Sequence, residues 1–160
     1  MSRSTNDDLT ALRRHLGRRH HLVGWCALLL FLSMGGFLES LHGFKAGFYL
    51  DPNNKIRREM WTLAHAHGTL LALVQIGFAA GLMHFGQWSV GRLKLASFFM
   101  LDATLLIPLG FFLGGIAPSE ADPWIGILLV PLGAILLFVA VALIIFASTR
   151  REPDKSDARL

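Results

Sequence analysis

Glu39 and His42 are the first residues along the chain whose types and spacing could do chemistry. They stand three residues apart, so on a helix both side chains lie on one face, about one turn apart. A carboxylate and an imidazole placed in this way can bind the same transition-metal ion. A dinuclear iron or manganese centre would need further carboxylates from other helices, and these are missing. The same pair could also be a simple acid-histidine contact at a membrane interface.

His65 and His67 form a second candidate pair, within an apolar stretch. Residues two apart on a helix point about 200° away from each other, so the two imidazoles can bind one ion only if the helix is distorted. We expect His65 to face inward, because Gly68 and Ala72 on its stripe are small. His67 then either supports the site without binding the ligand directly or belongs to a second site. All four residues would lie within about 10 Å of the outer membrane interface, which predicts a site for iron, copper, zinc or haem b.

Asp102 and Gln75 lie deeper in the apolar blocks and at matching depth. Ionisable side chains are costly inside a bilayer, so such positions often carry function. The two residues could form a proton relay, or they could make a hydrogen bond that joins two helices. His84 lies near the inner end of its block, where we expect an ordinary interfacial histidine.

The elements that position these residues are membrane-spanning helices. The chain is 53% hydrophobic and 16% charged, whereas soluble domains are about 25% charged. A transmembrane helix needs about 20 apolar residues, and no stretch alternates with the period of two expected of a barrel. The sequence therefore predicts an all-α, antiparallel bundle of four transmembrane helices. The expected spans are about 22–43, 61–85, 93–115 and 124–147.

The basic residues predict the orientation of this bundle. Eleven of the fifteen Lys and Arg residues flank the spans on the side of the two termini, which the positive-inside rule places in the cytoplasm. Residues 1–21 are then a basic cytoplasmic segment, 22–148 the membrane domain and 149–160 a charged cytoplasmic tail. We expect a bacterial inner membrane. One cysteine, Cys26, excludes an internal disulfide, and the distribution of basic residues at span ends argues against a nucleic-acid module.

A resemblance appears around the paired histidines. The stretch Trp61-Thr-Leu-Ala-His-Ala-His-Gly-Thr-Leu-Leu resembles the second-helix region of haem-copper oxidase subunit I, where a similar motif carries a haem ligand. The resemblance implies haem b bound by His65, with His42 as an axial partner. It covers about a dozen residues, and the chain lacks that family's further spans and copper-binding histidines, so it does not imply an oxidase.

The basic residues beside the histidine layer fit more than one interpretation. Lys55, Arg57 and Arg58 could bind haem propionates, or they could contact lipid phosphates. A different class of function is a non-catalytic accessory or scaffold subunit of a membrane complex, or a homo-oligomer, since the fourth span has no charged residue from Ile125 to Ala147. Whether the chain is an enzyme stays open. Gly77 with Gly81, and Gly110 with Gly114, have the spacing that lets helices approach closely.

Overall fold

The computed structural model describes residues 2–52, 55–119 and 122–149, and within these ranges it contains helices and no strand. Four helices are long and apolar enough to cross a membrane, which confirms the predicted fold class and is consistent with an integral membrane protein. The tail from residue 150 onward lies outside the described residues. The helices are α1 (Ser2–Gly43), α2 (Gly47–Leu50), α3 (Ile56–His84), α4 (Val90–Gly114), η1 (Ile125–Leu128) and α5 (Leu129–Thr149).

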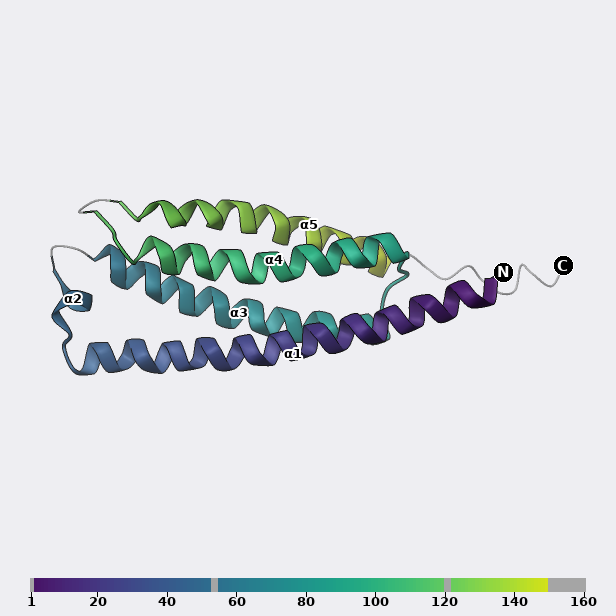
Figure 1. Ribbon diagram of the computed structural model, residues 1–160, viewed down its shortest axis with the longest axis horizontal. Helices are drawn as coiled ribbons and strands as arrows, with labels where there is room; N and C mark the ends of the chain where they lie inside the picture. The colour runs from purple at the N-terminus through teal and green to yellow at the C-terminus, as the bar shows by residue number, and fades with distance from the viewer. Residues whose placement is uncertain (1, 53–54, 120–121, 150–160) are drawn as a thin grey trace.

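The four long helices are antiparallel and lie in a row, with α1 on α3, α3 on α4 and α4 on α5 (Figure 1). In the described ranges, no Cα atom of α5 comes within 8 Å of α1 or α3, and α1 approaches α4 at few positions. The row has two ends. We call the end that contains α2 and η1 the α2 end, and the end where α3 connects to α4 through Trp88 the Trp88 end. The N-terminus of α1 and the C-terminus of α5 both lie at the Trp88 end (Figure 1).

Helix α1 is longer than the predicted span. It runs for 42 residues without a break at residue 22, about 63 Å at 1.5 Å per residue, and its first turns project beyond the other helices (Figure 1). Arg13 donates hydrogen bonds to the carbonyls of Leu82 (2.7 Å) and Phe85 (3.3 Å). A cation at this position satisfies carbonyls and the negative dipole at the end of α3. Part of the predicted cytoplasmic segment 1–21 therefore packs along α3.

Glycines allow α1 and α3 to pack closely. A Cβ added at Gly24 would lie 2.7 Å from the side chain of Ile76, and one at Gly68 would lie 2.4 Å from the ring of Phe31. Gly77 and Gly81, by contrast, face open space in the structure, with no atom within 4 Å of an added Cβ. The predicted close approach at that pair is therefore wrong. The second pair does lie in contact: Gly110 meets Val130, and Gly114 meets Pro123 and Ile127.

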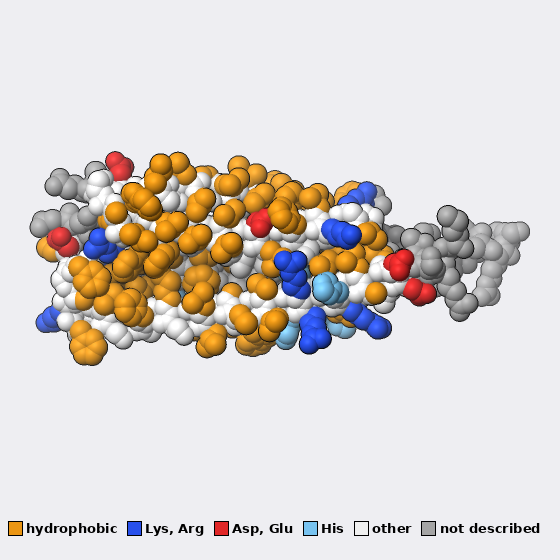
Figure 2. Space-filling model, viewed as in Figure 1, with side chains coloured by type: hydrophobic (Ala, Val, Ile, Leu, Met, Phe, Trp, Pro, Cys, Tyr) orange, Lys and Arg blue, Asp and Glu red, His pale blue; other side chains and the backbone are white. Residues whose placement is uncertain are grey.

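The surface and the core divide as expected for helices in lipid. Figure 2 shows hydrophobic side chains over much of the exposed face, with most charged side chains toward the two ends and a few nearer the middle. The main buried cluster joins Phe78, Trp88 and Met100 with Ala140 of α5. The outer helices are poorly covered, since only 11% of the most apolar window of α5 is buried. Much of α5 is thus free to contact lipid or another protein.

Candidate functional site

An open groove lies between α1 and α3 at the α2 end. It has a volume of about 780 Å³, within the range of roughly 300 to 1,000 Å³ that is typical of ligand pockets. Its lining combines leucines and glycines with ionisable side chains. The ionisable residues of the lining are Glu39, His42, Arg58, Glu59 and His65, and Tyr49 of α2 closes one side.

His65 is the best-positioned of these side chains. Its Nδ1 atom lies 2.7 Å from the carbonyl oxygen of Phe31 on α1 and donates a hydrogen bond to it. The ring fits against Gly35, where an added Cβ would lie 2.5 Å from Cε1 of His65. A backbone carbonyl on Nδ1 fixes the tautomer and leaves Nε2 with a lone pair, which is how proteins commonly orient a ligating histidine. The structure therefore presents one imidazole nitrogen that can act as a ligand.

His67 lies on the other side of α3. Its Nδ1 atom donates to the carbonyl of Leu63 in the same helix (2.9 Å), and its ring packs 4.8 Å from that of Phe111 on α4. It does not line the groove that contains His65. The expected separation of the two histidines is thus observed, with His65 toward α1 and His67 toward α4.

Of the four residues expected at one depth, Glu39, His42 and His65 line the groove and His67 does not. Throughout residues 2–52, 55–119 and 122–149, no three His, Cys, Asp or Glu side chains come together in a way that could hold a metal ion. Glu39 and His42 are exposed at the groove, and His67 faces away from them. As the helix period of 3.6 residues predicts, the two histidines of α3 face different neighbours.

Arg57 is bonded to backbone carbonyls of other segments at the α2 end. Its guanidinium donates to the carbonyls of Phe48 (3.0 Å), Gly115 (3.1 Å) and Ile116 (3.2 Å). These bonds tie α2 to the end of α4, where a cation also balances the helix dipole. Arg57 is thus already bound to the backbone, whereas Arg58 lines the groove. Of the three basic residues Lys55, Arg57 and Arg58, Arg58 is the one that lines the groove.

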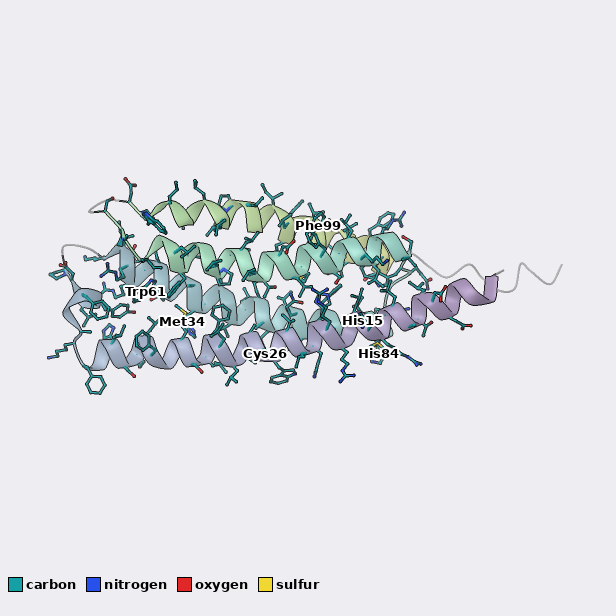
Figure 3. The ribbon with its side chains drawn as sticks, in the orientation of Figure 1. His15, Cys26, Met34, Trp61, His84 and Phe99 are labelled. Carbon is teal, nitrogen blue, oxygen red and sulfur yellow. The ribbon has the colours of Figure 1, made fainter. Side chains whose placement is uncertain are left out.

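Trp61 lies at the α2 end among aromatic side chains (Figure 3). Its ring is stacked between Tyr49, at 6.2 Å, and Phe112, at 5.7 Å. The indole nitrogen donates to the carbonyl of Phe112 at 3.1 Å. This stack joins α2 to α3 and α4, and Trp61 itself does not line the groove.

A second polar site is buried among α1, α3 and α4, nearer the Trp88 end. His20 and Gln75 are both 0% exposed. Nδ1 of His20 donates to the side-chain oxygen of Gln75, and Nε2 accepts from the hydroxyl of Ser97 at 2.8 Å. The amide nitrogen of Gln75 donates to Thr104 (2.9 Å) and to the carbonyl of Met100 (3.1 Å). We call His20, Gln75, Ser97 and Thr104 the buried polar network.

This network replaces the contact expected between Gln75 and Asp102. The described bonds of Gln75 go to His20, Thr104 and Met100, while Asp102 lies partly exposed on another face of α4. Sequence reasoning missed His20 because it stands in an Arg-rich segment. One signal could have found it: Leu16, His20 and Gly24 recur every four residues, which extends the buried stripe of the span backward.

Comparisons of the chain with family models, curated proteins and solved structures find no match. Function is therefore inferred from the side chains described above.

Proposed function

We propose that this chain is an integral membrane protein that binds haem b in the groove at the α2 end and takes part in one-electron transfer. The observation that carries the proposal is the orientation of His65. Its Nδ1 is held by the Phe31 carbonyl and its ring lies against Gly35, so that Nε2 is the free nitrogen. Haem iron is commonly bound through one such proximal histidine.

Haem suits this groove better than a bare metal ion does. A structural zinc site takes four protein ligands, and a catalytic one three, and the described residues gather no three metal ligands. Haem needs only one or two axial side chains, and the rest of its binding comes from apolar contact with the macrocycle. The groove offers such contact through Leu32, Leu38 and Leu63.

The polar residues of the groove have complementary roles in this proposal. Arg58 provides a cation for a propionate, through a charge-assisted bond. His42 would be the candidate for a second ligand, because it lines the same groove from the end of α1. Glu39 lies at the groove rim, where it would influence the potential of a bound haem by its charge.

The test is a titration of the purified chain with haem b in lipid nanodiscs, followed by visible absorption and a reduced-minus-oxidised spectrum. We expect one haem per chain with a shifted Soret band. His65→Ala should weaken haem binding by at least about tenfold. In metal sites, even the loss of a residue that only orients a ligand lowers metal affinity 10- to 100-fold. His67→Ala is the matched control, with the same residue type on the same helix but a different face.

Two results would contradict the proposal. One is a spectrum that matches free haem at every haem concentration although the chain is folded. The other is equal haem affinity in wild type and His65→Ala. Equal losses in His65→Ala and His67→Ala would indicate general disturbance of α3, and helix content by circular dichroism would then identify it.

A second candidate function is an accessory subunit of a membrane complex. It is supported by α5, whose span has a mean hydropathy of 3.1 and is 11% buried at its most apolar window. Extraction of the native complex in a mild detergent, followed by its mass, tests this role. A mass equal to the single chain with its lipid would contradict it.

A further inference from the structure

Asp102 stands at the middle of α4. It lies twelve residues from either end of Val90–Gly114, or about 18 Å along the axis in both directions. It is the only Asp, Glu, Lys or Arg between Lys94 and Gly115 in the sequence. An ionisable residue at this depth is costly unless it meets another polar group.

The carboxyl side chain of Asp102 is partly exposed on the outer surface of the row of helices. Its neighbours on that surface of α4, Phe98 and Leu105, are 59% and 61% exposed. No hydrogen bond or ion pair joins Asp102 to another of the described residues, and the nearby polar groups of His20 and Gln75 are already bonded to one another. A polar partner from beyond the described residues would offset the cost of this position.

An apolar cleft lies between α1 and α4, beside this carboxylate. Its volume is about 690 Å³. On α4 it is lined by Leu101, Leu105 and Leu109, so Asp102 is next to its α4 rim. On α1 it is lined by a helical stripe, which consists of Val23, Ala27, Leu30, Met34 and Phe37.

Arg19 continues that stripe on α1. It precedes Val23 by four residues, which places it on the same face of the helix. Arg19 is exposed, and no hydrogen bond or ion pair joins it to the rest of the described chain. A basic side chain, Arg19, thus continues the α1 stripe of the cleft, and an acidic one, Asp102, stands next to its α4 lining, and neither is bonded to another of the described residues. Acidic and basic side chains interrupt the hydrophobic surface near the middle of the face in Figure 2.

We propose that a second copy of this chain covers the cleft, and that Asp102 of each copy pairs with Arg19 of the other. A two-fold axis along the membrane normal keeps both copies in the same orientation and lays α1 of one over α4 of the other. Such an isologous contact makes both ion pairs at once. It also buries the two apolar clefts against each other.

The depths of the two residues are compatible with this pairing. His20 bonds to Ser97, so Arg19 lies near the level of Ser97, and Asp102 is five residues farther along α4. That offset is about 7.5 Å, and a long arginine side chain can extend along an apolar surface to cover most of it. A second copy thus supplies both the charge and the apolar face that the cleft lacks.

A charge exchange tests the proposal. Chains labelled with donor or acceptor fluorophores are mixed in lipid vesicles, and energy transfer is followed as lipid is added. We expect wild type to dimerise, and Arg19→Asp and Asp102→Arg each to lower the dimerisation constant by at least about tenfold, because each places like charges together. The double variant Arg19→Asp with Asp102→Arg should recover to within about threefold of wild type, since the pairs are restored with opposite sense.

Arg18→Asp is the matched control. Arg18 is also exposed, but it is five residues before Val23 and so points away from the cleft stripe. Asp102→Asn and Arg19→Gln give milder changes if the reversals unfold the chain, and circular dichroism checks helix content in each variant. Four results would overturn the proposal: a monomeric wild type, dimers that ignore both single changes, a double variant that does not recover, or equal loss in Arg18→Asp. The proposal does not depend on haem, because these measurements use the chain without added haem.

Discussion

The two polar regions of this protein use histidine in opposite ways. In the buried polar network, both ring nitrogens of His20 are hydrogen-bonded to side chains of other helices, and the residue has no exposed surface. In the groove at the α2 end, His65 is bonded through one nitrogen to a backbone carbonyl and lies beside open space. The first histidine joins three helices, whereas the second keeps a nitrogen available.

This difference separates a structural role from a binding role. A buried group whose partners are all present contributes to one helix arrangement, and loss of any partner leaves others unsatisfied. A side chain held at one atom and free at another is already oriented for a ligand. We therefore expect changes in the network to alter stability, and changes in the groove to alter haem binding.

The largest loss of stability is expected from Gln75→Leu. It removes the bonds to His20, Thr104 and the Met100 carbonyl, and each buried group left without a partner costs about 1 to 3 kcal/mol. We expect the free energy of unfolding in bicelles to fall by about 2 to 4 kcal/mol. Gln87→Leu, at an exposed position, should change it by less than about 0.5 kcal/mol. Equal effects of the two changes would contradict a structural role for the network.

The next largest effect should come from Gly68→Ala. The added Cβ would lie 2.4 Å from the Phe31 ring, and overpacking of this kind costs about 1 to 3 kcal/mol. Since Phe31 also holds His65 through its carbonyl, the same change should weaken haem binding. Gly77→Ala meets no atom within 4 Å and should leave both properties intact. If Gly77→Ala lowered stability and Gly68→Ala did not, α3 would be rotated about its axis so that Gly77 faces a neighbouring helix.

Arg57→Gln should have a smaller effect, restricted to the α2 end. The change removes bonds to the carbonyls of Phe48, Gly115 and Ile116, for a loss of about 1 to 2 kcal/mol. Hydrogen exchange around α2 should quicken. Arg58→Gln should leave exchange unchanged and lower haem affinity instead. If only Arg58→Gln altered hydrogen exchange around α2, the roles proposed for the two arginines would be wrong.

The smallest effect is expected from His84→Ala. His84 is exposed at the end of α3 (Figure 3) and its ring lies 6.2 Å from that of Phe85. Unfolding free energy should change by less than about 0.5 kcal/mol, and the haem spectrum should be unchanged. A large change in either measurement would show that histidines outside the two regions also carry function.

The sequence predicted much of the candidate site but not its assembly. The placement of Glu39, His42 and His65 at one end of α1 and α3 follows from helix length and depth, and all three line the groove. The role of Arg57 could not be predicted, because its partners at Gly115 and Ile116 are 58 and 59 residues away. His67 packs against Phe111 on α4 instead, and depth alone could not predict which neighbour that face of α3 meets.

The sequence by itself determined four apolar helices and the opposite directions of His65 and His67, because run length and helix period are local properties. Only the tertiary structure decided how far α1 extends along α3. That register depends on contacts between residues distant in the sequence: Arg13 with the end of α3, Gly24 with Ile76, and His20 with Gln75. The register brings a histidine from an Arg-rich segment into the core, and it sets Arg19 in line with the cleft stripe, about 7.5 Å along the axis from the level of Asp102. Local sequence patterns do not specify such pairings, because in lipid the pairing of two helices depends on how closely small residues let their surfaces approach.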